Sequence, residues 1–503
     1  MSETFNISKR NKGQRKKGVL ILAVFFVLSR MAYLFLFDVN FDLQLLDAGW
    51  QYIDIELLQG DLLNSLFYLH SQPPAYNLFL GIIIKLFPEG YEMVFHLTYF
   101  LVGYALLLLL FLFSFRLGLG FYPSLGIALY FLLSPAAILY ENFLFYTYPL
   151  AALLLLSAHL LLLYMDTRKA YLLWWFSLVV FSMAMTRSMF HLVWIITVFG
   201  FIMVLLPYAR RALLIPSLLC LLLVVGWNAK NKMLFNTFSA STWLGMNISS
   251  MLLPKEVEKL EALVEKGDAS PIILAHKWNT LAAYHERDSS VLLASEQYPK
   301  IRVLNDLNKS NGETNYHHIG YIQASNDFKK ASIASLSAYP KTYLYNLLGA
   351  NLRYFTPSAS YFILEGNYQK IAGYANLFNL DLARLLGKGK VNQNEPAWVL
   401  PLRALPLALV YLFAVYILLK LMWALIFKKV IIDKRLLYLS AYMLFNIAFV
   451  MLIGNALEVW ENMRFRFLTN PLLLVLLVVL WQQYKRLSEK QQTRRRDPSA
   501  SGA

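Results

Sequence analysis

The chain alternates long apolar runs with short clusters of basic residues. A membrane-spanning helix needs about 20 mostly apolar residues, and an apolar run bounded by charge is its sequence signature. Such runs lie at 19–37, 92–115, 121–140, 143–164, 171–186, 189–206, 212–227, 398–427, 436–454 and 465–484. The pattern predicts an all-α polytopic membrane protein with about ten spans, to within about two.

The amino-acid composition also indicates a membrane protein. The 503 residues are 58% hydrophobic and only 15% charged, whereas soluble domains carry about a quarter charged residues. The net charge of +16 comes from clusters between apolar runs, so it indicates membrane topology and no nucleic-acid partner. Cys220 is the single cysteine, which excludes an intrachain disulfide and a cysteine-based metal centre.

The distribution of charge predicts which segments face the cytoplasm. Basic residues concentrate on the cytoplasmic side of membrane proteins. The basic tail 1–17 and the basic clusters at Arg116, Arg168/Lys169, Arg210/Arg211, Lys428/Lys429 and Lys434/Arg435 are therefore predicted to be cytoplasmic. Residues 38–72 hold six acids and no Lys or Arg, so they are predicted to face outward. This topology requires the short segment after Pro73-Pro74 to be interfacial or re-entrant.

Five regions follow from this topology. They are a cytoplasmic basic tail (1–17), an N-terminal transmembrane catalytic module (18–227) with a first outer loop (38–91), an outer domain (228–396), C-terminal transmembrane helices (397–484) and a cytoplasmic basic tail (485–503). Turn residues between helical stretches predict a mostly helical outer domain. The last tail is basic and then Ser/Gly-rich, which predicts disorder. A bacterial plasma membrane is the expected location, with the endoplasmic reticulum as the alternative.

The first outer loop carries the pattern of an amphipathic helix. At 100° per residue, Leu46, Trp50, Ile53 and Leu57 form one stripe. Gln44, Asp47, Gln51 and Asp54 lie on a neighbouring face. A helix lying flat on the membrane would hold Asp47 and Asp54 at headgroup depth, where a lipid-linked substrate presents its polar end.

Three stretches resemble a known superfamily. The order of "LDAGWQYIDIELLQGDL", "HSQPPAYNLFLGIIIKLF" and "LSPAAILYENFLFYTYPLAALLLL", with "ENMRFRFLTNPLLLVLL" near the C-terminus, resembles the GT-C membrane glycosyltransferases. This superfamily includes the protein O-mannosyltransferases and the aminoarabinose transferases. The resemblance covers about the first 190 and last 50 residues. The family's His-Pro-Pro is split here by Ser71-Gln72, its Arg-Tyr is Arg464-Phe465, and its second loop lacks the usual acid after "SP".

The resemblance implies a GT-C-like helix bundle that moves a sugar from a polyprenyl-phosphate donor to a lipid, glycan or protein acceptor on the outer face. Asp47 matches the first-loop aspartate of the family and is the expected general base, with Asp54 as the alternative. The residues expected to bind the donor phosphate or substrate are His70, Glu141, Tyr148, Arg187, His191, Arg464 and Arg466. Arg353 is a further arginine near a predicted span end. No cofactor is required, although a divalent ion on Asp47, Asp54 and Glu141 remains an alternative.

Each assignment has a structural alternative. Asp47 and Asp54 can be solvated acids, and Arg187 with His191 can be a membrane anchor. Arg464 and Arg466 can pair with Glu458 and Glu461, which lie three or more residues away on the same helix. His317 and His318 are interpreted as surface histidines, because adjacent side chains point apart and make a poor metal motif.

Two other functions fit a polytopic protein with a large outer region. A lipid-linked oligosaccharide polymerase or ligase would also use arginines, but it has no need of an acidic first loop followed by Pro-Pro. A transporter of lipid-linked glycans would place charges near the middle of the membrane or in broken repeated helices. The sequence has no Gly-rich nucleotide loop, which argues against an ATP-driven pump.

Overall fold

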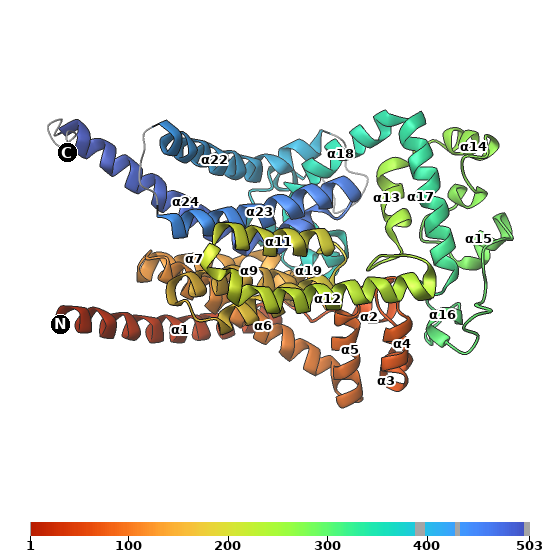
Figure 1. The fold of residues 1–503 in the computed structure, drawn as a ribbon, viewed down its shortest axis with the longest axis horizontal. Helices are drawn as coiled ribbons and strands as arrows, with labels where there is room; N and C mark the ends of the chain where they lie inside the picture. Colours follow the sequence, from red (N-terminus) through yellow and green to blue (C-terminus); the bar gives the residue numbers. More distant parts are fainter. Residues whose placement is uncertain (1, 388–397, 428–432, 497–503) are drawn as a thin grey trace.

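The computed structural model describes residues 2–387, 398–427 and 433–496, whose regular elements are all helices apart from two isolated β-bridges. The long apolar helices lie side by side along the long axis of the molecule (Figure 1). The two chain ends lie at one end of this bundle, and helices of the predicted outer domain lie at the other (Figure 1). The predicted all-α polytopic architecture is confirmed.

Seven described helices are long and apolar enough to cross a membrane. They are α1 (Ser2–Phe37), α6 (Tyr91–Arg116), α9 (Thr147–Thr167), α12 (Arg210–Phe235), α22 (Val399–Phe427), α23 (Lys434–Leu457) and α24 (Asn462–Arg496). An eighth candidate is the pair α7 (Phe121–Leu133) and α8 (Pro135–Glu141), which is bent by 60°. The bend lies where Ser134 is extended and Pro135 lacks an N–H for the helical ladder.

The seven candidate spans, or eight with the bent pair, compare with a predicted ten to within about two. Helices form at two further predicted runs, as α10 (Tyr171–Thr186) and α11 (Leu192–Leu205), but they have only 16 and 14 residues. At 1.5 Å per residue these helices are about 24 and 21 Å long, shorter than the roughly 30 Å hydrocarbon core. Both apolar runs were identified from composition, but their helices are short. Helix α10 ends before Arg187, and α11 ends before the short 3-10 helix η1 (Pro207–Ala209).

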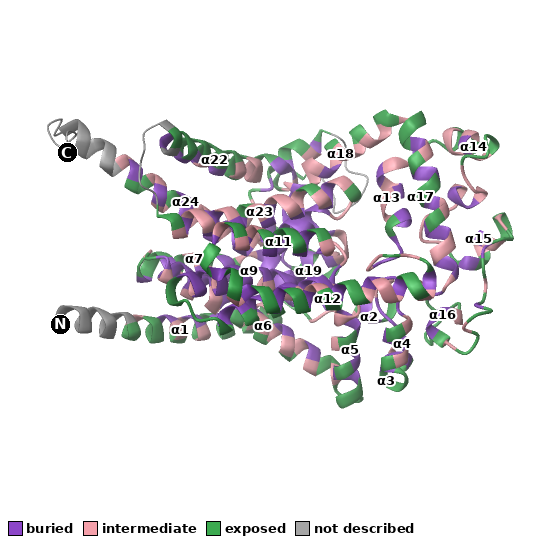
Figure 2. Cartoon of the chain, in the orientation of Figure 1, coloured by how far each residue is buried: buried purple, intermediate pink, exposed green. Residues whose placement is uncertain are grey.

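Helices α9 and α24 form the centre of the bundle. In their most apolar 18-residue stretches, 67% and 78% of the residues are buried. The corresponding share is 17% in α1 and in α22, whose outward faces are exposed (Figure 2). Buried polar pairs connect the inner helices: the hydroxyls of Ser157 and Tyr442 lie 2.8 Å apart, and Trp194 Nε1 donates to Asn446 Oδ1 at 3.0 Å. These bonds satisfy polar groups that lipid could not.

Basic residues from distant segments meet at the end of the bundle that holds the termini. Arg116 Nε and Arg435 Nη1 each lie 2.6 Å from a carboxylate oxygen of Asp166. This arrangement agrees with the predicted grouping of basic clusters on one side, although Lys428 and Lys429 lie outside the described residues.

The C-terminal tail differs from its prediction. Helix α24 continues to Arg496, so the predicted disorder of 485–503 is wrong for residues 485–496. The straight-chain residues of this stretch are good helix formers, and they extend a helix that is already nucleated. Residues 497–503 lie outside the described part of the chain.

The first outer loop folds as four short helices. They are α2 (Gln44–Ala48), α3 (Ile55–Gly60), α4 (Leu62–Tyr68) and α5 (Ala75–Leu86). The 12-residue α5 exposes Leu78, Ile82 and Leu86 on one face, as expected of the interfacial segment predicted after Pro73-Pro74. The prediction of one amphipathic helix through 44–57 is wrong. The chain leaves the helix at Gly49, which is extended, and enters the next after Asp54, which caps α3.

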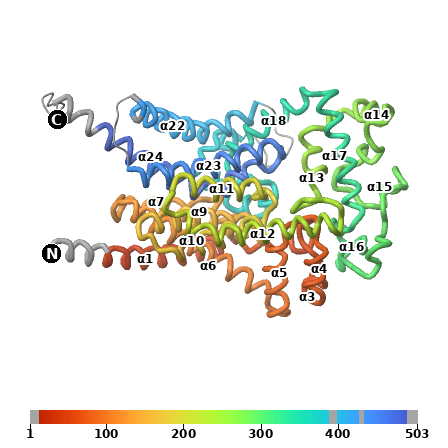
Figure 3. Tube along the Cα trace, in the orientation of Figure 1, coloured from red at the N-terminus to blue at the C-terminus, as the bar shows by residue number. Residues whose placement is uncertain are grey.

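The described part of the predicted outer domain is mostly helical, and α12 continues to Phe235, beyond the apolar run that ends at 227. Its helices are α13 (Leu244–Leu252), α14 (Val257–Glu265), η2 (Pro271–Leu274), α15 (Leu281–Arg287), α16 (Arg302–Asn305), α17 (Gly320–Ala338), α18 (Pro340–Tyr354), η3 (Ser358–Ser360), η4 (Phe362–Leu364), α19 (Glu365–Lys370), α20 (Ala372–Phe378) and α21 (Leu382–Leu385). Figure 3 shows the first outer loop beside α16 and the end of α12.

The packing of α13 on α17 requires a glycine. Gly245 N–H donates to Ser325 Oγ at 3.1 Å, and a Cβ at this position would overlap the carbonyl oxygen of Ser325. The two backbones can approach this closely only without a side chain at position 245.

We expect Gly245→Ala to destabilise the outer domain by about 1–3 kcal/mol, since the added methyl group must displace backbone. Thermal unfolding of the detergent-solubilised protein, followed by tryptophan fluorescence, measures the effect. Gly366→Ala is the matched control, because a Cβ on Gly366 in α19 would meet open space. Equal melting temperatures for Gly245→Ala and wild type would contradict this packing requirement.

Candidate functional site

Three predicted arginines converge where α10 ends and α24 begins. Arg187 follows the last residue of α10, and Arg464 and Arg466 lie in the first turn of α24. The three residues are 7%, 2% and 4% exposed. The guanidinium carbon of Arg187 lies 4.5 Å from the ring centre of Phe465, and both Arg187 and Arg464 lie within 6 Å of the Tyr146 ring. We name Arg187, Arg464, Arg466 and Glu461 the arginine cluster.

Glu461 is the carboxylate of this cluster. It forms an ion pair with Arg464, as the alternative interpretation of the sequence predicted, and its Oε1 accepts a hydrogen bond from Tyr361 OH at 2.8 Å. Glu458 does not pair with Arg466; its Oε1 instead accepts hydrogen bonds from the backbone N–H groups of Val459 and Trp460.

The arginine cluster carries three positive charges and one negative charge. Within the described residues, Arg187 Nη1, Arg464 Nε and Nη1, and Arg466 Nε are buried and have no hydrogen-bond acceptor. Arg466 Nη2 is satisfied, because it donates to Thr356 O and Ser358 Oγ at 2.8 and 2.7 Å. A buried charged donor without an acceptor costs several kcal/mol, so the cluster is suited to an anionic ligand.

The first outer loop reaches the arginine cluster through residues 142–146. Asp42 pairs with Phe143 in a parallel β-bridge, and Tyr52 OH donates to Leu144 O at 2.6 Å. Tyr99 OH donates to Phe145 O at 2.7 Å. The ring centre of Phe145 lies 4.8 Å from the Arg464 guanidinium. Segment 142–146 thus has the first loop on one side and arginines on the other.

Glu141 and Tyr148 lie together, in a second buried group. Both carboxylate oxygens of Glu141 bind Arg30 of α1, at 2.8 and 2.5 Å, and Tyr148 OH donates to Glu141 Oε2 at 3.0 Å. Gly103 of α6 makes room, because a Cβ there would overlap the Glu141 carboxylate. The sequence did not reveal Arg30 as the partner, because it lies 111 positions from Glu141. This pairing gives Glu141 a structural role.

The two predicted bases have different surroundings. Asp54 is buried, and its oxygens accept hydrogen bonds from Ser310 N at 2.7 Å and Ser310 Oγ at 2.6 Å. It also caps α3 through Glu56 N. Asp47 is exposed, and no hydrogen bond or ion pair reaches its carboxylate from the described residues. Of the two, Asp47 has the carboxylate that is available to a substrate.

Lys309 holds the loop that bears Asp47. Its Nζ donates to Asp47 O at 3.1 Å and to Gly49 O at 2.8 Å. Burial lowers the pKa of Lys309 to about 8, while the nearby Asp54 carboxylate opposes that shift. Lys309 and Ser310 therefore attach the outer domain to the first loop.

His70 belongs to a buried histidine network, and the interpretation of His317 and His318 as surface residues is wrong. His70 Nε2 donates to His317 O at 2.8 Å, and Nδ1 lies 2.8 Å from Thr242 Oγ1. Ser71 Oγ lies 2.5 Å from His317 Nδ1. All three histidines are at most 1% exposed. Their polar character suggested a surface, but the tertiary fold buries them and provides hydrogen-bond partners for five of their six ring nitrogens. His317 Nε2 is buried and has no partner among the described residues.

The remaining predicted residues lie apart from these groups. His191 caps α11 by accepting from Val193 N at 3.2 Å, and Arg353 packs over the Trp460 ring at 4.4 Å. Asp47, Asp54 and Glu141 do not form a metal-binding group; within the described residues no three His, Cys, Asp or Glu side chains do.

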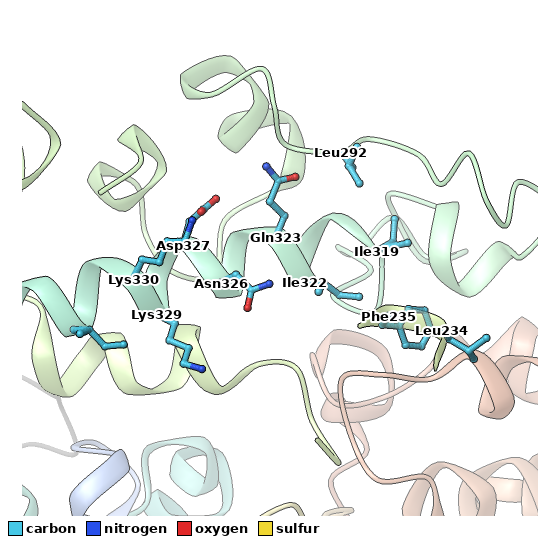
Figure 4. Close-up of a pocket in the computed structure, with 11 residues that line it drawn as sticks. Leu234, Phe235, Leu292, Ile319, Ile322, Gln323, Asn326, Asp327, Lys329 and Lys330 are labelled. Atoms are coloured by element: carbon cyan, nitrogen blue, oxygen red, sulfur yellow. The ribbon is translucent and has the colours of Figure 1, made fainter. Parts of the chain in front are cut away.

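A groove of about 660 Å³ lies between the end of α12 and α17. Ile322, Asn326 and Lys329 of α17 line this groove together with Leu234 and Phe235 at the end of α12 (Figure 4). None of the residues predicted from the sequence lines it.

Comparison with known proteins finds no matching family model, no matching curated relative and no matching solved structure.

The histidine network makes stability depend on pH. Burial lowers the pKa of His70 and His317 to about 3 and that of His318 to about 4. The unfolded chain titrates near 6.5, so below this pH it binds protons that the folded chain does not. We expect the free energy of unfolding to fall by about 1.4 kcal/mol per histidine for each pH unit below about 6.5.

Thermal unfolding between pH 7.5 and 5 measures this dependence, with Trp243, whose ring lies 5.8 Å from that of His317, as an intrinsic probe. His317→Gln removes one of the three groups and should reduce the slope by about a third. An unchanged slope in His317→Gln would contradict the assignment.

The buried ion pair of Arg30 and Glu141 gives a second prediction. Glu141→Leu leaves the Arg30 charge buried without its partner and should cost about 3–5 kcal/mol. The double variant Arg30→Met/Glu141→Leu removes both charges and should recover most of the loss. Melting temperatures of the four proteins in this cycle provide the measurement; a double variant as unstable as Glu141→Leu would show that the pair is not the cause.

Proposed function

We propose that this protein is a membrane glycosyltransferase that moves a sugar from a polyprenyl-phosphate donor to a lipid, glycan or protein acceptor on the outer face of a bacterial plasma membrane. The observation that carries the proposal is the arginine cluster, whose buried guanidinium N–H groups lack acceptors among the described residues. The sequence resemblance to the GT-C glycosyltransferases supports it independently.

The leaving group explains why arginines suit this reaction. The acceptor oxygen attacks the anomeric carbon of the sugar, and the bond from that carbon to the phosphate oxygen breaks. The lipid phosphate leaves with the bonding electron pair and gains negative charge. Arg187 and Arg464 would stabilise that charge through bidentate, charge-assisted hydrogen bonds in a site from which water is excluded.

The acceptor must lose a proton in the same reaction, and a carboxylate is the proposed base. Asp47 is proposed because its carboxylate is exposed and unpaired among the described residues, and because it matches the first-loop aspartate of the GT-C enzymes. Asp54 is less suited, because Ser310 occupies both its oxygens. Glu461 is a second carboxylate to test, since it lies within the arginine cluster.

Aromatic rings beside the arginine cluster fit a lipid-linked sugar. Tyr76 lies 5.5 Å from the Tyr146 ring, and Tyr140 stacks on Phe467 at 4.1 Å. Such rings stack on sugar faces and isoprenoid chains. Tyr76 belongs to the first outer loop, and Tyr140 belongs to α8, which directly precedes segment 142–146.

A lipid-linked oligosaccharide polymerase or ligase is the second candidate. It is favoured by the excess of positive charge in the arginine cluster, which also suits a diphosphate leaving group, and by the absence of a described contact between Asp47 and that cluster. The sugar donor distinguishes the two functions: the transferase uses a polyprenyl-phosphate monosaccharide, and the polymerase or ligase uses a lipid-linked oligosaccharide diphosphate.

We expect Arg464→Gln to lower kcat/KM for sugar transfer by about 10²–10³-fold, the loss typical for removing one donor to a developing anion. The assay combines purified protein with a panel of radiolabelled polyprenyl-phosphate monosaccharides and membrane glycolipids or proteins as acceptors. Arg168→Gln, at the opposite end of α9, is the control and should retain wild-type activity. Transfer only from oligosaccharide diphosphate donors would favour the ligase, and full activity of Arg464→Gln would rule out the proposed role of the cluster.

We expect Asp47→Asn to lose about 10²–10⁴-fold in kcat while it still binds the donor, because a general base contributes to the chemical step. Glu461→Gln, measured in parallel, tests the other carboxylate. Loss of kcat in Glu461→Gln with full activity in Asp47→Asn would move the base to Glu461.

A further inference from the structure

The groove between the end of α12 and α17 lies where a candidate membrane span reaches the membrane surface. Helix α12 carries no charged side chain between Arg211 and Lys230. At 1.5 Å per residue, a hydrocarbon core of about 30 Å takes up about 20 residues, so a core that begins after Arg211 ends near Asn231. Leu234 and Phe235, which line the groove, therefore lie at the depth of the lipid head groups.

Exposed apolar side chains line and flank the groove. Leu292 and Ile333 line it, and they are 48% and 57% exposed. Met233, near the end of α12, and Phe238, which follows that helix, are 83% and 55% exposed. Exposed apolar side chains at the end of a span are typical of a surface that lipid covers.

One face of α17 combines apolar side chains with a positive charge. The groove residues on this face are three or four positions apart: Ile322, Asn326, Lys329 and Ile333. Asp327 and Lys329 extend to opposite sides of the helix (Figure 4). Burial raises the pKa of Asp327, and the charge of Lys330 opposes that rise.

Lys329 is the cation of this face. Its side chain is exposed, and no hydrogen bond or ion pair reaches its amine from the described residues. The other two lysines near the end of α12 are engaged: Lys230 Nζ donates to Phe67 O and Leu69 O, and Lys232 Nζ donates to Asn236 Oδ1 at 2.6 Å. Lys329 is therefore available to an anion at head-group depth.

We infer that this groove binds an anionic phospholipid of the bilayer, with the lipid phosphate on Lys329 and the apolar part of the lipid against the groove walls and the end of α12. A soluble anion would leave the apolar walls exposed to water, and a neutral apolar molecule would leave Lys329 without a counter-charge. Phospholipid head groups surround every span at this depth. The site shares no residue with the arginine cluster and does not depend on the proposed transferase function.

The test titrates delipidated full-length protein with dioleoylphosphatidylglycerol and measures the apparent Kd of each bound lipid by native mass spectrometry. We expect a saturable site on the wild type and about fivefold weaker binding in Lys329→Gln, the effect of one lysine charge beside an anionic lipid. Equal apparent Kd values for Lys329→Gln and the wild type would overturn the proposal.

Two further variants separate the charge of the site from its shape. Asn326→Trp keeps the charge and places an indole ring in the groove, so it should weaken binding by about fivefold or more. Asp327→Asn removes the carboxylate beside Lys330 and should tighten binding by about fivefold. Wild-type binding by Asn326→Trp would place the lipid outside the groove, and weaker binding by Asp327→Asn would contradict an anionic ligand. Either result would overturn the proposal.

Two control variants test whether the effect is local. Lys266→Gln removes the same charge from an exposed lysine after α14, outside the groove, and should bind like the wild type. Arg464→Gln should also bind like the wild type, which separates this site from the proposed active site. If Lys266→Gln weakened binding as much as Lys329→Gln, net charge alone would explain the effect and the proposal would be overturned.

Other ligands identify what the groove recognises. Dioleoylphosphatidylcholine has the same chains but no net charge, and it should bind the wild type more weakly; equal affinity for both lipids would overturn the proposal. Glycerol phosphate that competes at the same concentration as the lipid would assign the groove to a soluble anion. A polyprenyl phosphate that displaces the phospholipid at lower concentration would assign the groove to the sugar donor. Both of these results would overturn the proposal.

Discussion

Burying guanidinium groups away from water costs free energy, and the structure must offset this cost at the end of the bundle next to the predicted outer domain. Arg464 pairs with the carboxylate of Glu461, and several N–H groups of Arg187, Arg464 and Arg466 face no acceptor among the described residues. Such an arrangement persists only if the surrounding structure is rigid enough to oppose its relaxation. The rings of Tyr146 and Phe465 supply part of the compensation through cation–π contacts. The packing of α24 and α9 at the centre of the bundle supplies the rigidity.

Arginines are exposed and paired at one end of the bundle and buried at the other. At the end with the chain termini, Arg116 and Arg435 pair with Asp166, and their side chains are 25% and 36% exposed. The Asp166 carboxylate and exposure to solvent satisfy these charges. At the other end, the guanidiniums of the arginine cluster are buried, and among the described residues one carboxylate, that of Glu461, forms an ion pair with them. The same residue type is thus structural where it is paired and a candidate for ligand binding where it is not.

The outer domain and the first loop form one unit around these arginines. Lys309 and Ser310 bind the backbone at Asp47 and the carboxylate of Asp54, and His70 bonds to His317 O. These contacts fix the loop that bears Asp47 relative to segment 142–146, which contacts Arg464 on its other side. The first loop, which bears Asp47, and segment 142–146, which contacts Arg464, are also joined through Asp42 and Tyr52.

The sequence by itself determined the fold class, because apolar runs of spanning length have no other stable arrangement than helices in lipid. It also offered the pairing of Arg464 with Glu461 as an alternative, since residues three apart at the start of a helix are neighbours. Tertiary structure decided the rest. The pairing of Glu141 with Arg30, the capture of Asp54 by Ser310 and the burial of His317 join residues from distant segments, which local periodicity does not reveal. Asp47 and Asp54 lie on different elements because α2 ends at Gly49, which is extended. The amphipathic pattern of the sequence continues through Gly49 and therefore predicted a single helix.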